Sequence, residues 1–154
     1  MDGLHLTAEL HECAAKALLA EPAALRALCL AAVAEAGLTP VGELFHHFTA
    51  AGGGITGVVL LAESHLAVHT WPELGAVTLD VYVCNLSADN SGRAERVVAA
   101  LEAAFAPGRR QVQRLHTAAH RPVPPAGTPA AGCRGGAAFS AVDLKQLRRR
   151  RLQS

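Results

Sequence analysis

Hydrophobic and polar residues alternate along much of the chain, a pattern typical of strands with one buried face. Residues 3–13 begin this pattern, with Leu4, Leu6 and Leu10 separated by polar side chains. Similar runs of strand length, rich in valine and leucine, recur further along the chain. They predict strands over residues 40–48, 55–61, 65–71, 76–84 and 111–116. Residues 72–75, Pro-Glu-Leu-Gly, predict a turn between two of these strands.

Alanine and leucine adopt helical spacing in two segments. The first predicted helix covers about residues 23–36, and Gly37 is a natural stop for it. The second has Asp89 or Ser91 as its N-cap and runs to about Phe105. Together these elements predict an α+β fold, a two-layer sandwich in which an antiparallel sheet carries two helices on one face.

Composition divides the chain into two parts. Its 154 residues suit one domain with a modest core, and residues 1–118 are assigned to that domain. Residues 119–154 form a tail rich in Pro, Gly and Ala, which predicts extended or disordered chain. Within the tail, residues 139–152 predict a short amphipathic helix, and the basic run at residues 148–151 is expected to be solvated. Residues 49–57 predict a flexible, glycine-rich link.

Charge and cysteine usage narrow the classes of function. A formal net charge of +1 gives no reason to expect a nucleic-acid or membrane partner. The N-terminus lacks the pattern of a signal peptide, and no stretch reaches the ~20 apolar residues of a membrane span. The cysteines form no CxxC pair, which disfavours a zinc site or a disulfide framework and predicts a cytoplasmic protein.

One short run, AESHLAVHTWPE at residues 62–73, concentrates reactive side chains. Ser64 follows Glu63, and a serine beside a base is a potential nucleophile. The chain has no GxSxG motif here and no evident third triad member, so hydrolysis is a weak interpretation. On residue type alone, a polar residue at a strand end explains Ser64 better than a nucleophile does.

Self-cleavage needs fewer parts than hydrolysis. The Ser64 hydroxyl can attack the Glu63 carbonyl, and elimination from the resulting ester leaves a dehydroalanine that hydrolyses to a pyruvoyl group. That group forms Schiff bases with amines and accepts electrons. The route needs a nucleophile, an oxyanion donor, a base and a proton donor, for which Ser64, Thr56, His69 and Cys84 are suitable residue types. In a straight strand Ser64 and His69 would face opposite sides, so the route requires a bend near Ser64.

The sequence ESHLAVHTWPE, followed by LDVYVC, resembles the hallmark of the prokaryotic S-adenosylmethionine decarboxylases, a pyruvoyl-dependent family. GLHLTAELHEC is similar to the family's opening strand, FHHF to its second strand and ITGVVLLAESH to the approach to its cleavage site. The resemblance covers about residues 3–118, and the joint pattern is highly specific. It implies a self-processing enzyme whose decarboxylated product donates aminopropyl groups in spermidine synthesis.

By this resemblance, the chain cuts itself between Glu63 and Ser64, and Ser64 becomes the covalent pyruvoyl cofactor. His69 and Thr56 assist processing, and His69 is also expected to be catalytic. Cys84 would protonate the substrate carbon after carbon dioxide leaves.

The resemblance also implies a pocket for S-adenosylmethionine. Glu73 would bind the ribose hydroxyls, because a carboxylate offers two acceptor oxygens. Phe48 would stack on the adenine with His69 on its other side, and Leu66 and Trp71 would shape the pocket. The family implies a homodimer of cleaved protomers with active sites near the subunit interface, and no metal.

Three features depart from the family's usual pattern. The link between Phe48 and Thr56 carries extra glycines, which leaves the place of Phe48 open. Ala67 stands where a polar residue is common. The sequence VCN, ending at Asn85, replaces the frequent TCG, so the backbone beside Cys84 is expected to differ.

Three alternatives remain open from the sequence. The same cofactor and fold could act on arginine or ornithine, because specificity depends on the pocket. An inactive homologue that regulates a partner is disfavoured, since Ser64, His69 and Cys84 are all present. A metal site using His65, His69 and Cys84 is the weakest alternative, because these residues form no clear cluster in the sequence.

Overall fold

The structure is a computed structural model, and it describes residues 2–49, 52–86 and 88–117. All of them belong to one unit, residues 1–121. The tail predicted over residues 119–154, with its short helix, lies outside the described residues.

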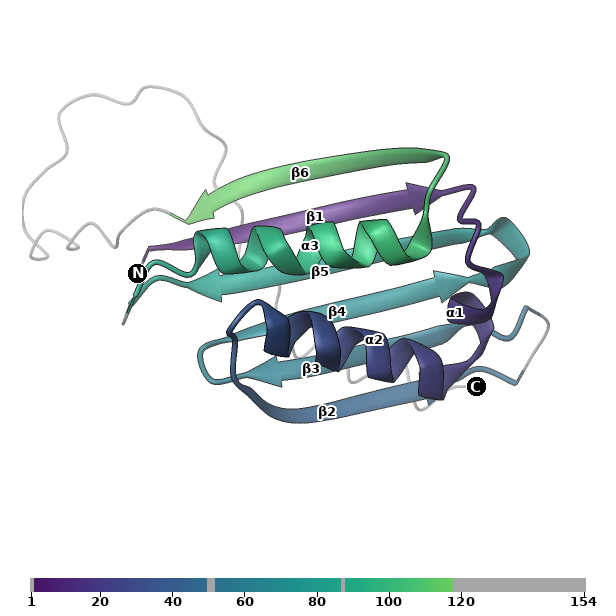
Figure 1. Cartoon of the computed structure of the whole chain (residues 1–154), viewed down its shortest axis with the longest axis horizontal. Coiled ribbons are helices and arrows are strands. Elements are labelled where there is room, and N and C mark those ends of the chain that lie inside the picture. The colour runs from purple at the N-terminus through teal and green to yellow at the C-terminus, as the bar shows by residue number, and fades with distance from the viewer. Residues whose placement is uncertain (1, 50–51, 87, 118–154) are drawn as a thin grey trace, which may run out of the picture. The chain divides into compact units, whose positions relative to one another are not determined.

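Six antiparallel strands form one sheet in the spatial order β2-β3-β4-β5-β1-β6 (Figure 1). Their bounds are Gly3–His11 for β1, Pro40–His47 for β2, Ile55–Leu61 for β3, Ser64–Trp71 for β4, Ala76–Cys84 for β5 and Arg109–Thr117 for β6. Strands β2 to β5 follow one another as neighbours, and β1 lies between β5 and β6. The strands that carry most of the reactive residues, β4 and β5, are therefore central and paired on both sides.

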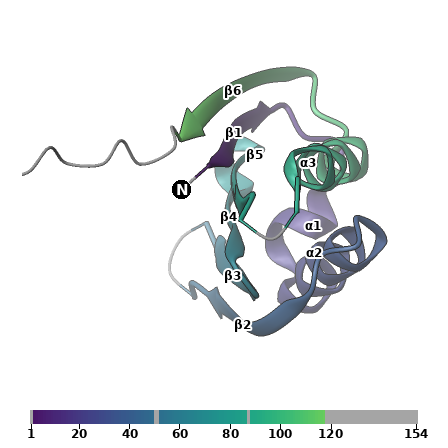
Figure 2. The same cartoon turned by 90° about the vertical axis from the view of Figure 1, so that its left-hand side faces the viewer.

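The described α-helices lie on one face of the sheet, and none of them covers the opposite face (Figure 2). They are α1 at Lys16–Ala20, α2 at Pro22–Glu35 and α3 at Ser91–Phe105, and a short 3-10 helix, η1, spans Pro72–Leu74. Helix α2 contacts β2 and β3, whereas α3 contacts β1 and β5. The predicted antiparallel sheet is confirmed, but its helical layer has a third member because Pro22 begins a new helix directly after α1. Among the described residues, no helix combines the length and hydropathy needed to cross a membrane.

Strand boundaries differ from prediction where local geometry intervenes. Strand β1 ends at His11, before the predicted end at residue 13, because Glu12 has a positive φ of 57°. Strand β6 is longer than predicted because it pairs with β1 along its whole length. Strand β3 has the predicted bounds, residues 55–61, so the flexible link predicted over residues 49–57 ends before Ile55.

The start of α3 corrects the predicted N-cap. Asn90 occupies the cap position, not Asp89 or Ser91. The Ser91 backbone N–H donates to Asp89 Oδ1 at 2.9 Å. Hydrogen bonds from the backbone and the hydroxyl of Ser91 lower the pKa of Asp89.

The hydrophobic core fills the space between the sheet and the helices. Alternate residues of the central strands face it, including Leu66, Val68, Leu79 and Val81. The helices contribute further fully buried side chains: Leu25, Cys29, Val33, Leu101 and Phe105. Each large apolar side chain buried in this way contributes about 1.5–3 kcal/mol. The face of the sheet away from the helices, here named the open face, carries the remaining strand residues.

Burial raises the pKa of the Cys29 thiol from 9.0 to about 12, which predicts a pH-dependent loss of stability. Above about pH 9 the unfolded chain loses the Cys29 proton while the native chain keeps it, so the native state binds more protons and becomes less stable as pH rises. As pH rises above about 9, we expect the free energy of unfolding of the wild type to fall more steeply than that of Cys29→Ala. The difference in slope should reach up to about 1.4 kcal/mol per pH unit. Urea denaturation of both proteins from about pH 8 to about pH 11 measures this difference, and parallel pH profiles would contradict it.

Candidate functional site

Ser64 lies where β4 begins, directly after the two-residue turn of Ala62 and Glu63. The backbone N–H of Cys84, the last residue of β5, donates to Ser64 Oγ at 3.3 Å. Cys84 itself is only 3% exposed. The bend that would bring Ser64 and His69 together is absent, because β4 runs without a break from Ser64 to Trp71 and the chain turns only before Ser64. The backbone of Cys84 therefore lies beside the candidate nucleophile, and the Cys84 thiol donates to the Asp2 carbonyl at 3.8 Å.

A cavity of about 190 Å³ opens next to the Glu63–Ser64 peptide bond. Asn90 and Arg93, from the start of α3, also line it. The Arg93 guanidinium donates to Asn90 Oδ1 at 3.1 Å. The Glu63–Ser64 peptide bond, the N-terminal end of α3 and the Arg93 side chain thus line one cavity. The positive end of the helix dipole and the Arg93 charge stabilise negative charge there.

Asn85 and Asn90 fix the backbone on the other side of Cys84. Asn90 is 8% exposed, and its Nδ2 donates to the Cys84 carbonyl at 2.8 Å. Asn85 Oδ1 accepts the backbone N–H of Asn90 at 2.9 Å. The departure at VCN thus supplies the side chain that closes this loop. Both backbone polar groups of Cys84 are therefore hydrogen-bonded: its N–H donates to Ser64 Oγ, and its carbonyl accepts from Asn90 Nδ2.

Thr56 and His69 form a second polar pair, on the open face. They are directly opposite each other in the register of β3 and β4. Thr56 Oγ1 and His69 Nδ1 lie 3.0 Å apart and share a hydrogen bond. With its proton on Nε2, the imidazole accepts from the hydroxyl through Nδ1 and presents an N–H to the cavity.

A cavity of about 390 Å³ lies over this pair. Besides the residues of the link and Thr70, its lining includes Phe48, Thr56, His69, Trp71 and Glu73. The rings of His69 and Trp71 have centroids 6.2 Å apart. Aromatic walls with one carboxylate suit a ligand that combines a flat ring with hydroxyl groups.

The extra glycines of the link keep Phe48 at this cavity. The Phe48 backbone N–H donates to the Gly54 carbonyl at 2.9 Å. A Cβ at Gly54 would lie 2.3 Å from the Thr70 carbonyl, and one at Gly52 would lie 2.8 Å from Glu73 Oε2. Only glycine permits these approaches, so the link passes closely along β4 and η1.

Thr70 holds the start of β3 in place from the core side of the sheet. Its hydroxyl accepts the Ile55 N–H at 2.8 Å and donates to the Leu19 carbonyl at 2.7 Å, and its side chain is buried. Sequence reasoning missed Thr70 and Asn90, although a polar residue within a buried strand face and an N-cap asparagine are the signals to look for.

The predicted site residues therefore form two groups. The Ser64 group comprises Glu63, Ser64 and Cys84, and the His69 group comprises Phe48, Thr56, His69, Trp71 and Glu73. Ser64 and His69 are five positions apart in a continuous strand, which corresponds to about 16 Å and to opposite faces. Leu66, expected to shape the pocket, lies in the hydrophobic core at 1% exposure and lines neither cavity.

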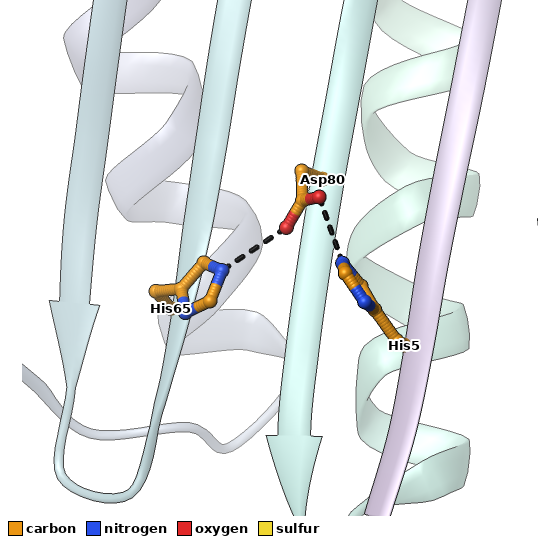
Figure 3. Close-up of polar contacts among 3 residues, drawn as sticks. All are labelled: His5, His65 and Asp80. Carbon is orange, nitrogen blue, oxygen red and sulfur yellow. Dashed lines mark hydrogen bonds and ion pairs between the residues drawn. The ribbon is translucent and has the colours of Figure 1, made fainter. Parts of the chain in front are cut away.

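A third polar cluster, unnoticed in the sequence, occupies the open face beside the Ser64 group (Figure 3). Asp80 of β5 lies between two histidines, with Oδ2 2.7 Å from His5 Nε2 and Oδ1 3.0 Å from His65 Nε2. His65 therefore pairs with Asp80, not with His69 and Cys84 as the metal alternative requires. Within the part of the chain that the structure describes, no group of three or more His, Cys, Asp or Glu side chains is arranged to hold a metal ion.

Comparison with known protein families and structures gives one consistent match. The family model described as S-adenosylmethionine decarboxylase matches residues 4–117. The chain is 42% identical over 82 residues to an S-adenosylmethionine decarboxylase proenzyme of Archaeoglobus fulgidus, covering 53% of this chain and 70% of that protein. A proenzyme of the same name from Thermotoga petrophila is 35% identical over 118 residues, 77% of this chain and 82% of the relative.

A solved structure, the adenosylmethionine decarboxylase of Aquifex aeolicus, is similar to the chain with a TM-score of 0.68 and 31% identity. The match covers 79% of this chain and 94% of that one. It extends over nearly the whole of the solved chain.

Replacing Asn90 tests how strongly its hydrogen bonds hold the loop after β5. In Asn90→Ala the Cys84 carbonyl and the Arg93 guanidinium lose their partner, and we expect the free energy of unfolding to fall by about 1–3 kcal/mol. Leu86→Ala, in the same loop but 72% exposed, is the matched control and should change it by less than about 0.5 kcal/mol. Urea denaturation measures both variants, and equal effects would show that Asn90 contributes nothing specific.

Proposed function

The chain belongs to the S-adenosylmethionine decarboxylase family, and we propose that it works through a pyruvoyl group made from its own Ser64. Its reaction converts S-adenosylmethionine into S-adenosylmethioninamine, the aminopropyl donor of spermidine synthesis. The names of the relatives favour this substrate over arginine or ornithine. The observation that carries the pyruvoyl proposal is the hydroxyl of Ser64, held by the Cys84 N–H at the exit of a tight turn.

Processing begins when Ser64 Oγ attacks the Glu63 carbonyl carbon. The amide C–N bond breaks, the serine nitrogen takes the proton, and an ester joins the two residues. Removal of the Ser64 Cα proton then breaks the Cβ–Oγ bond, so that Glu63 departs as a carboxylate that keeps the serine oxygen. The remaining dehydroalanine tautomerises to an imine, water adds to the imine carbon, and its nitrogen leaves as ammonia. A ketone carbonyl remains at the new N-terminus. Arg93 and the start of α3, which line the adjoining cavity, stabilise the oxyanion of the first step.

The residues around Ser64 fit a pyruvoyl group at the new terminus. When present, that group supplies an electrophilic carbonyl for the substrate amine and an electron sink for decarboxylation. The Cys84 N–H that holds the hydroxyl in the uncut chain remains as a donor to an oxygen at position 64. Cys84 also provides an acidic proton, and we assign it the return of that proton to the substrate carbon.

A complete site requires two copies of the chain. The His69 group lies about 16 Å along β4 from Ser64, too far for its imidazole to act on Ser64 of the same chain. The open face that carries the His69 group also exposes Leu44, Leu60 and Leu115, at 69%, 49% and 53%. We infer that a second copy placed on this face buries these side chains and places its His69 group beside the end of β4 that carries residue 64 of the first copy.

In the assembled site, the cavity of the His69 group holds the adenosyl part of the substrate. Phe48 and His69 enclose the adenine, Trp71 forms a wall, and the two oxygens of Glu73 accept hydrogen bonds from the ribose hydroxyls. The Thr56–His69 pair assists processing, with Thr56 as hydroxyl donor and the imidazole as base for the Ser64 Cα proton.

The same proposal covers the organisation of the chain and its compartment. Residues 1–118 form the decarboxylase core, cut between Glu63 and Ser64, and residues 119–154 are an appended tail. The described cysteines are free thiols, which suits a reducing cytoplasm.

Removing the Ser64 hydroxyl tests the origin of the cofactor. We expect Ser64→Ala to remain one chain without activity, because no ester can form, and Cys84→Ala to be cut but to release carbon dioxide at least about 100-fold more slowly. An intact mass spectrum detects cleavage, and labelled S-adenosylmethionine, arginine and ornithine measure turnover. Two fragments from Ser64→Ala, ending at the same peptide bond, would disprove the mechanism.

A mixture of two inactive chains tests whether the site is shared. Chains carrying Ser64→Ala and chains carrying His69→Ala are produced together with different affinity tags, and the mixed dimer is purified through both. One of its two sites then contains Ser64 from one chain and His69 from the other, so we expect about half of the wild-type activity per dimer. Each variant alone should retain at most about 1% of that activity.

The mixed dimer gives opposite results for the two arrangements. If Ser64 and His69 act within the same chain, neither site of the mixed dimer is complete, and the mixture stays as inactive as the separate variants. That result would overturn the shared site while leaving the pyruvoyl proposal in place.

A further inference from the structure

Asp80 joins three strands of the open face through two histidines (Figure 3). His5 projects from β1, Asp80 from β5 and His65 from β4, and both imidazoles direct Nε2 at the carboxylate. The side chains are partly buried, with exposures of 31% for His5, 34% for Asp80 and 40% for His65. Strand alternation and the register of the sheet bring them together, because His5 and His65 are both opposite Tyr82, two residues from Asp80.

Tyr82 packs beside both imidazoles, whose own ring centroids lie 6.4 Å apart. Its ring centroid lies 5.8 Å from that of His5 and 5.9 Å from that of His65. The tyrosine limits the rotamers of both histidines from one side, and the Asp80 carboxylate holds their Nε2 atoms from the other. His65 therefore has a defined position although its side chain is partly exposed.

Cleavage changes which contacts hold residue 64 in place. In the uncut chain, the peptide bond to Glu63 and the bond from the Cys84 N–H to Ser64 Oγ hold this residue. Cleavage breaks the peptide bond, and the serine oxygen departs with Glu63. The backbone ladder of β4, the Cys84 N–H and the side chain of His65, which Asp80 holds, then keep the new terminus in the sheet.

We propose that Asp80 is a positioning residue, which holds His65 and through it the carbonyl-bearing terminus at residue 64 once the chain is cut. This inference rests on the proposed pyruvoyl function. Asp80 lines neither the 190 Å³ cavity nor the 390 Å³ cavity, so we expect its loss to change turnover and not substrate binding. Displacement of a reacting group by about 1 Å is enough to reduce a rate about 100-fold.

His5 offers a matched control for His65. Both are imidazoles on the same carboxylate and both pack on Tyr82, but only His65 is bonded to the reactive residue. We expect His65→Ala and Asp80→Ala to be cut normally and to lose at least about 10-fold in kcat with KM within about threefold. His5→Ala should keep kcat within about threefold, because Asp80 still holds His65.

A double variant separates positioning from general support of the sheet. If Asp80 acts through His65, the variant that combines Asp80→Ala and His65→Ala should have the same kcat as the worse single variant. Asp80→Asn keeps the shape of the side chain and one acceptor oxygen, and it should recover several-fold in kcat over Asp80→Ala. It also provides a folded test protein if Asp80→Ala does not fold.

The measurements are intact mass for cleavage, kcat and KM for turnover, and thermal unfolding for stability. Equal losses of kcat in the His5, His65 and Asp80 variants, or unchanged kcat in both Asp80 variants, would overturn the positioning role. These outcomes are distinct from failure of the proposed function, which would appear as a wild-type protein that is active but uncut.

Discussion

The two-residue period of a β-strand constrains what one copy of this chain can assemble. In β4, Leu66, Val68 and Thr70 face the helices, because the core requires apolar or fully hydrogen-bonded side chains there. His65 and His69 consequently face the open side. Ser64 and His69 cannot meet within one straight strand, and this single constraint divides the reactive residues into two groups.

The one-sided helical layer gives the two faces of the sheet different chemistry. Below the helices the strands contribute leucine and valine, and burial of these side chains stabilises the fold. The open face instead carries the Thr56–His69 pair, the Asp80 cluster and several exposed leucines. The open face thus combines exposed apolar side chains with hydrogen-bonded polar groups, and the proposed dimer would bury both.

The position of the proposed cut explains how the fold survives it. The bond between Glu63 and Ser64 lies at a hairpin turn, so cleavage removes none of the strand pairing. Strand β1, on the N-terminal fragment, lies between β5 and β6 of the C-terminal fragment, and α2 packs against α3 across the same division. The two fragments are interleaved in one sheet and one core, and new ends at position 63 and position 64 leave both intact.

The sequence by itself determined the six strands, the two long helices, the antiparallel α+β class and the reactive residue types, because side-chain period, turn residues and motifs are local properties of the chain. It also indicated that Ser64 and His69 face opposite sides. Only the tertiary structure decided which of these residues meet: Ser64 with the Cys84 backbone, Thr56 with His69, and Asp80 with both His5 and His65. Those contacts depend on strand order and register, which result from packing of the whole sheet, and no spacing along a single strand contains that information.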